Sequence, residues 1–159
     1  MNFNKLKINQ EHIQSLREIC KWYGIEFEVR FTKGLTETAY ACLLQEKIVL
    51  TIRRDCEIAY AYTLFFHELA HLHNKHSNKY PLYHDPHPEK FNLTQRINFM
   101  RTTSRAELYT EKVGARLLGY YFPDIPYIKG YTKENMKADG IRLNADFKLY
   151  FDYLDSKQK

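Results

Sequence analysis

Cysteine, proline and glycine are all scarce in this chain of 159 residues, which has three cysteines, five prolines and six glycines. The cysteines, Cys20, Cys42 and Cys56, are odd in number and form no CxxC pair, which disfavours a disulfide framework and an all-cysteine zinc site. The longest largely apolar run, residues 58–66, is far shorter than the roughly 20 residues of a membrane-spanning helix. No apolar signal segment follows Met1. We therefore expect a cytoplasmic protein without a membrane partner.

Blocks of like charge are also missing, although the formal net charge is +5. The 24 lysines and arginines are spread along the whole chain, so the charge permits nucleic acid as a partner but gives no local support for it. Hydrophobic residues make up 44% of the chain and charged residues 27%, as in ordinary globular proteins. This length fits one core, so we expect a single domain over residues 1–159.

The first third of the chain predicts one helix followed by three strands. Apolar residues recur at helical spacing over residues 9–23, and Gly24 then interrupts the pattern. Residues 25–31 alternate between apolar and polar, and residues 38–44 and 47–52 read as two further strands joined by a tight turn. Together they predict a short, mostly antiparallel sheet. The strand at 38–44 suits either a core position or an exposed edge that pairs with an extended peptide.

The remainder of the chain is predicted to be mainly helical. Asp55 is a candidate N-cap for a buried helix whose apolar stripe has spacings of three and four, and this stripe comprises Ile58, Ala61, Tyr62, Phe65, Phe66, Leu69 and Leu72. Residues 74–103 are polar and contain three prolines, which predicts a long excursion with some helix near 92–100. Helices are also expected at 104–122, 133–139 and 144–154. The predicted class is α+β.

A metal-binding motif lies on the predicted buried helix. His67 and His71 are four residues apart, so their imidazoles project from one face of a helix and can converge on one ion. Glu68 flanks this face and can act as a general base, because zinc lowers the pKa of a coordinated water to about 7. The pattern predicts one zinc ion per chain, with His67 and His71 as ligands and Glu68 as the catalytic base.

The third ligand must come from elsewhere in the chain, and two carboxylates qualify. Glu107 and Glu111 lie four residues apart and would share one face of the helix predicted at 104–122. One would bind the metal, and the other would support a ligating histidine through its second ring nitrogen. Ser104 and Glu107 also match a capping box, in which Glu107 would only close the helix N-terminus and Glu111 would be the ligand.

Residues 63–71, with the HELAH motif, and residues 105–111, RAELYTE, resemble the metallopeptidase domains of the ImmA/IrrE group and of ArdC-type antirestriction proteins. The resemblance covers about residues 36–123. It implies a small zincin-like, gluzincin-type fold in which the sheet packs on the active-site helix. It also implies Glu107 as the metal ligand and Glu111 as its supporting neighbour. Two features depart from the family pattern: Thr110 stands where alanine is customary, and the stretch between His71 and Glu107 is long.

These residues predict a zinc-dependent metallopeptidase, a hydrolase of peptide bonds whose partner is a protein or peptide substrate. The resemblance adds a phage, mobile-element or regulatory setting. The alternative is a non-proteolytic zinc-binding antirestriction or regulatory protein that binds nucleic acid or protein. The histidines that follow the motif, His73, His76, His84 and His87, are expected to face solvent. Tyr80 or Tyr83 would reach the site if residues 74–103 formed a lid over it.

Overall fold

The computed structural model describes residues 6–42, 45–77 and 93–130 of the chain. The chain divides into two compact units, one of residues 1–77 and 110–129 and the other of residues 78–109 and 130–159. Most of the second unit lies outside the described residues, as do the helices expected at 133–139 and 144–154 and the tyrosines of the expected lid. The expectation of a single domain over residues 1–159 therefore stays a prediction.

The first helix, α1 (Gln10–Tyr23), begins and ends where the sequence predicts. Asn9 accepts a hydrogen bond from the backbone N–H of His12, and the His12 ring accepts one from the Asn9 backbone, so two otherwise unpaired N–H groups are satisfied. Gly24 ends the helix in the left-handed region, with a φ of 69°, where a residue without a Cβ is favoured. Local side-chain chemistry thus fixes both ends of α1.

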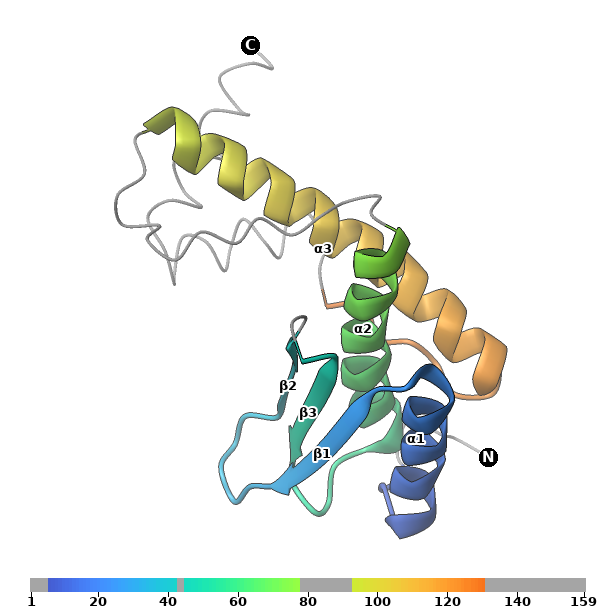
Figure 1. The fold of residues 1–159 in the computed structure, drawn as a ribbon. Coiled ribbons are helices and arrows are strands. Elements are labelled where there is room, and N and C mark those ends of the chain that lie inside the picture. Colours follow the sequence, from blue (N-terminus) through green and yellow to red (C-terminus); the bar gives the residue numbers. More distant parts are fainter. Residues whose placement is uncertain (1–5, 43–44, 78–92, 131–159) are drawn as a thin grey trace. The chain divides into compact units, whose positions relative to one another are not determined.

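The three strands are β1 (Glu26–Phe31), β2 (Thr38–Cys42) and β3 (Lys47–Ile52), in the order β1-β3-β2 (Figure 1). Strand β2 pairs with β3 in an antiparallel register in which Tyr40 lies opposite Val49, as expected for a hairpin. Strand β1 pairs with β3 in parallel, with Val29 opposite Leu50. The expectation of a mostly antiparallel sheet is therefore wrong, because the sheet is mixed. Parallel strands need a long connection, and the connection from β1 to β3, residues 32–46, contains β2.

Two helices complete the described elements, α2 (Ile58–Ser77) and α3 (Leu93–Tyr121). Helix α2 starts three residues after Asp55, so Asp55 is not its N-cap; its carboxylate instead accepts a hydrogen bond from Arg53. Helix α3 joins the segments expected to be helical near 92–100 and at 104–122 into one helix. Ser104 and Glu107 therefore lie inside a helix, and the capping-box interpretation of this pair is wrong. The described residues thus form an α+β structure.

The core of the first unit lies between the sheet and helices α1 and α2. Helix α2 packs against β2 and β3, and α1 packs against β1 (Figure 1). The predicted stripe of α2 is buried throughout, and its aromatic members Tyr62, Phe65 and Phe66 pack edge to face or tilted against one another. Strand β3 contributes Ile48, Leu50 and Ile52. This apolar packing holds α2 on the sheet and thereby fixes the direction in which its other face points.

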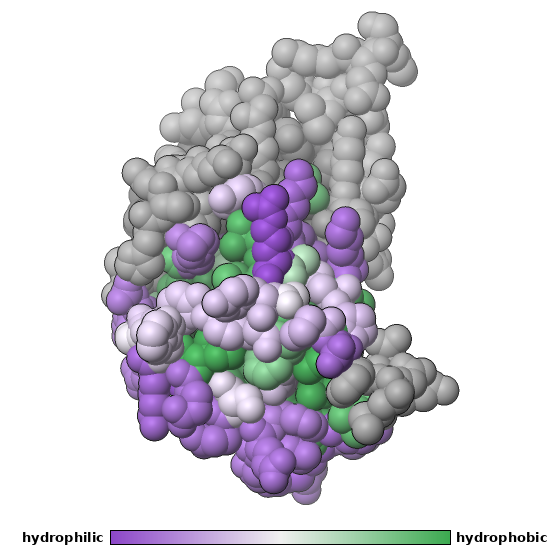
Figure 2. Space-filling model, turned by 90° about the vertical axis from the view of Figure 1, so that its right-hand side faces the viewer, coloured by the Kyte–Doolittle hydropathy of each residue, from purple (hydrophilic) through white to green (hydrophobic). Residues whose placement is uncertain are grey.

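The surface of the unit carries hydrophilic side chains and several exposed aromatic ones. Trp22 at the end of α1 and Tyr120 at the end of α3 are largely exposed. One face shows apolar side chains reaching the surface in small patches between hydrophilic ones (Figure 2). Within the described residues, no helix is both long and apolar enough to cross a membrane.

Candidate metal centre

The two motif histidines lie side by side on α2. The ring centroids of His67 and His71 are 4.8 Å apart, and both residues are almost fully buried, with whole-residue exposed fractions of 6% and 7%. Their position follows from the stripe of α2: the apolar residues face the sheet and the core, and the histidines occupy the adjoining face one helical turn apart. The convergence of the two rings is the first requirement of the predicted site.

Helix α3 supplies the carboxylates. Ligand atoms of His67, His71 and Glu107 lie within 4.8 Å of one another, close enough for one ion to contact all three. Glu111 stands one turn further along α3 and is buried, with an exposed fraction of 4%. Its Oε1 atom lies 2.8 Å from Nδ1 of His67. The structure therefore separates the two carboxylates: Glu107 joins the group of possible ligands, and Glu111 contacts a ring nitrogen of His67.

The contact with Glu111 decides which nitrogen of His67 is available to a ligand. A buried carboxylate oxygen at 2.8 Å is satisfied by a proton on Nδ1, and the neutral ring then presents its Nε2 lone pair. A carboxylate behind a histidine is a common arrangement at zinc sites, where it fixes the tautomer and the ring orientation. Glu111 thus has the position expected of a supporting residue.

Two residues to which the sequence assigns no role at the site also belong to this group. The Thr110 hydroxyl is fully buried and lies 3.4 Å from Nδ1 of His71, so this position supplies a weak partner for the second histidine. Tyr127 donates a hydrogen bond of 2.9 Å to Oε1 of Glu111. The sequence marks Thr110 only as a departure from a family pattern. Its position next to Glu111 on the same helix is the one sequence feature that indicates a place near the histidines. No sequence signal connected Tyr127 with α2.

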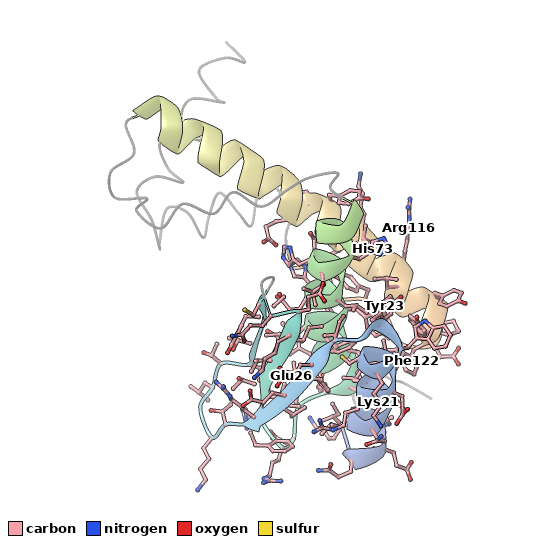
Figure 3. The ribbon with its side chains drawn as sticks, viewed as in Figure 1. Lys21, Tyr23, Glu26, His73, Arg116 and Phe122 are labelled. Carbon is pink, nitrogen blue, oxygen red and sulfur yellow. The ribbon has the colours of Figure 1, made fainter. Side chains whose placement is uncertain are left out.

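Glu68 is half-buried and directly follows His67 on α2. His73 lies two residues after the motif, on α2 and exposed to solvent (Figure 3), as predicted for it. His84 and His87 lie outside the described residues, and the side chain of His76 is likewise not described.

We call His67, His71, Thr110, Glu111 and Tyr127 the histidine cluster.

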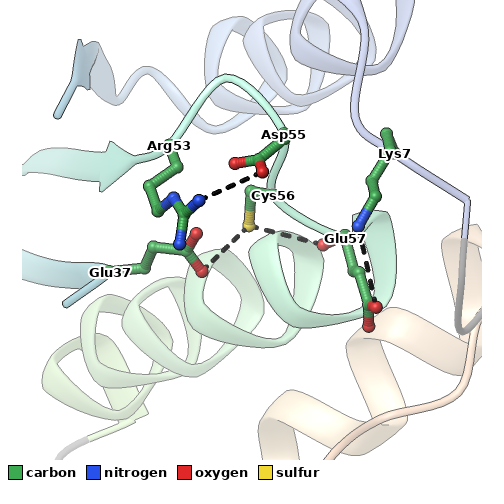
Figure 4. Close-up of polar contacts among 6 residues, drawn as sticks. All are labelled: Lys7, Glu37, Arg53, Asp55, Cys56 and Glu57. Atoms are coloured by element: carbon green, nitrogen blue, oxygen red, sulfur yellow. Dashed lines mark hydrogen bonds and ion pairs between the residues drawn. The ribbon is translucent and has the colours of Figure 1, made fainter. Parts of the chain in front are cut away.

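A second polar group lies at the start of α2 (Figure 4), and its residues line an open pocket of about 220 Å³. The Cys56 thiol donates to the Glu37 carboxylate at 3.2 Å, and burial raises the pKa of this thiol to about 12. Arg53 pairs with Asp55 at 3.1 Å and Lys7 pairs with Glu57 at 3.8 Å. We call these residues, Lys7, Glu37, Arg53, Asp55, Cys56 and Glu57, the Cys56 cluster. Two ion pairs thus flank the thiol, which stays protonated at neutral pH.

Comparison with protein-family models, with curated protein sequences and with solved structures found no match to this chain.

Proposed function

We propose that this protein is a zinc metallopeptidase whose metal ion is held by His67, His71 and Glu107. The observation that carries the proposal is the convergence of three possible ligand atoms within 4.8 Å, two of them from almost fully buried histidines. With Glu111 at Nδ1, His67 would bind the metal through Nε2.

The donor set favours a catalytic ion over a structural one. Two imidazoles and a carboxylate are three protein ligands, the number found at catalytic zinc sites, whereas structural zinc normally has four. Zinc bound there would supply Lewis-acid chemistry, by acidifying a water molecule and polarising a carbonyl group. The features that fit zinc are the types of the three donor groups and their closeness.

Glu68 is the proposed general base and acid. Its carboxylate would accept a proton from the water that attacks the peptide carbonyl carbon, and would return that proton to the amine nitrogen as the C–N bond breaks. Its place next to His67 brings it to the same turn of α2 as the first ligand, and it is half-buried. Strand β2 is an edge of the described sheet and packs against α2, so an extended peptide could pair with it near this helix.

The resemblance to the ImmA/IrrE group belongs to the same proposal. We propose a zincin-like domain of this type, with a phage, mobile-element or regulatory role. Support comes from the HELAH motif on α2 and from Glu107 and Glu111 one turn apart on α3. The customary alanine is replaced by Thr110, whose buried hydroxyl lies near His71, so this replacement is compatible with a metal site.

The decisive experiment compares wild type with Glu68→Gln. Zinc content is measured by mass spectrometry on protein purified without a histidine tag, and cleavage is measured with a library of quenched fluorescent peptides. We expect both proteins to hold one zinc per chain, and we expect the variant to cleave at least about 100-fold more slowly, because general acid–base catalysis typically contributes that much. A zinc-loaded wild type that cleaves no member of the library would instead favour the non-proteolytic binding protein.

The identity of the third ligand has its own test. Glu107→Gln should lower the zinc affinity by removing a charged ligand, and Glu111→Gln should lower it less, because Glu111 acts through His67. The larger loss in Glu111→Gln would exchange the roles of the two carboxylates. Both affinities are measured by competition with a chromophoric chelator.

A further inference from the structure

The segment after α3 folds back against α2 and contacts the histidine cluster. Helix α3 ends at Tyr121, and residues 125–128, which we call the return segment, follow Pro123 and include Pro126. Ile125 is buried and belongs to the core. The backbone N–H of Ile128 donates to the hydroxyl of Thr63 on α2 at 3.0 Å. The return segment is therefore held by the core before Tyr127 and by α2 after it.

Space for the Tyr127 hydroxyl is provided by Gly114 on α3. A Cβ atom at this position would lie 3.0 Å from the Tyr127 hydroxyl, 3.2 Å from the Phe66 carbonyl oxygen and 3.3 Å from the His67 Cα atom. These distances are tighter than side chains normally tolerate, so glycine here permits α3, α2 and the return segment to approach closely. Gly114 thereby brings a tyrosine hydroxyl and the backbone of a proposed ligand to the same place.

The Tyr127 hydroxyl and the His67 ring contact the same oxygen atom. Oε1 of Glu111 accepts from the Tyr127 hydroxyl at 2.9 Å and lies 2.8 Å from Nδ1 of His67. A carboxylate can rotate about its terminal bond, and a second donor on the same oxygen restricts that rotation. With Oε1 held in place, the proton on Nδ1 and the plane of the His67 ring are held as well.

We propose that Tyr127 is a positioning residue for the metal centre, acting through Glu111 on the orientation and tautomer of His67. This inference rests on the proposed metallopeptidase function and extends it to a residue 56 positions beyond the motif, counted from His71 to Tyr127. Supporting residues around metal ligands typically change metal affinity by about 10- to 100-fold, and Tyr127 acts one contact further out. We therefore expect an effect of about 3- to 10-fold.

The test compares Tyr127→Phe with wild type and with the control Tyr120→Phe. Phenylalanine keeps the ring of Tyr127 and removes only its hydroxyl, and Tyr120 is a largely exposed tyrosine on α3. Zinc dissociation constants are measured by chelator competition, and the visible absorption spectrum is recorded after loading with Co²⁺, which reports the geometry of the ligands. Tyr127→Phe should weaken zinc binding by about 3- to 10-fold and shift the Co²⁺ bands, since outer contacts orient metal ligands. Tyr120→Phe should match wild type in both.

The possible results distinguish a failure of the role of Tyr127 from a failure of the metallopeptidase proposal. A wild type that binds zinc, together with an unchanged affinity and spectrum in Tyr127→Phe, overturns the role of Tyr127 and leaves the metallopeptidase proposal standing. A wild type that binds neither zinc nor Co²⁺ overturns both. If Tyr127→Phe does not fold, Thr63→Val replaces it, because this change removes the anchor of Ile128 and keeps the tyrosine. An unchanged affinity and spectrum in Thr63→Val would then overturn the inference.

Discussion

Two polar clusters lie on the first unit, and they differ in how far their polar groups are removed from water. In the Cys56 cluster the ion-paired side chains are largely solvated, with exposed fractions of 61% for Asp55 and 44% for Glu57. In the histidine cluster the side chains of His67 and Glu111 are only 7% and 6% exposed. Surface ion pairs contribute little to stability, whereas buried polar groups are costly unless they are fully partnered.

The burial of polar groups in the histidine cluster costs free energy, whereas the solvated Cys56 cluster avoids this desolvation. The apolar stripe of α2 contributes to the core against the sheet, and His67 and His71 lie outside this stripe. A carboxylate, a hydroxyl and a phenol are nevertheless arranged around the two rings. Replacing a buried polar network with apolar residues is often neutral or stabilising, so this arrangement is consistent with the proposed metal site.

The largest expected effect comes from removing the central acceptor of the histidine cluster. Glu111→Ala would leave His67 and Tyr127 without the oxygen that both now contact. Each buried donor left unsatisfied costs about 1–3 kcal/mol, so we expect the free energy of unfolding to fall by about 3 kcal/mol. Urea denaturation of the metal-free protein measures this loss.

The matched control lies in the Cys56 cluster. Glu57→Ala removes the solvated partner of Lys7 and should change the free energy of unfolding by less than about 1 kcal/mol. Equal losses in Glu57→Ala and Glu111→Ala would show that the two clusters do not differ in the way described.

A second comparison concerns the thiols. Burial raises the pKa values of Cys20 and Cys56 to about 12, whereas Cys42 on β2 is half-buried. Only the thiolate is nucleophilic, so Cys42 should react with iodoacetamide at pH 8 at least about 100-fold faster than the other two. The protection of Cys20 and Cys56 should weaken as the pH rises toward 12, because their deprotonated fraction then grows. Peptide mapping of the alkylated protein gives the three rates, and fast alkylation of Cys56 at pH 8 would contradict the prediction.

A smaller effect is expected from a pair of glycine substitutions in α3. Gly114→Ala would force a Cβ against Phe66, His67 and Tyr127 and should destabilise the protein by about 1–3 kcal/mol. A Cβ at Gly119 would meet nothing within 4 Å, so Gly119→Ala should stabilise the helix by up to about 1 kcal/mol. Thermal unfolding of both variants measures the difference. Stabilisation by Gly114→Ala would mean that the return segment and α2 are not closely packed there.

The sequence predicted the elements that depend on neighbouring residues. The ends of α1 are set by Asn9 and Gly24, and the stripe of α2 is set by its helical spacing, so both were correctly predicted. The parallel pairing of β1 with β3 was missed, because strand order depends on contacts between distant segments and alternation alone does not encode it.

At the metal centre, too, the residues close together in the sequence were predicted, and the contact between distant residues was not. His67, Glu68 and His71 occupy five consecutive residues, and their helix was recognised from its pattern. The length of α3 was underestimated, which left Glu107 open to interpretation as a cap. Tyr127 lies 16 residues beyond its partner Glu111 and reaches it only because the chain folds back after α3. Such a contact is created by the tertiary fold and leaves no periodic signal in the sequence.

The central claim, that His67 and His71 share one metal ion, is tested most directly by the metal content of three proteins. Wild type, His71→Ala and His73→Ala are purified without a histidine tag, dialysed against buffer containing zinc at a low free concentration, and analysed by mass spectrometry. We expect about one zinc per chain in wild type and in His73→Ala, whose substituted histidine is exposed on the same helix, and less than about one tenth in His71→Ala. Full zinc occupancy in His71→Ala, or less than about half an equivalent in wild type, would contradict the account.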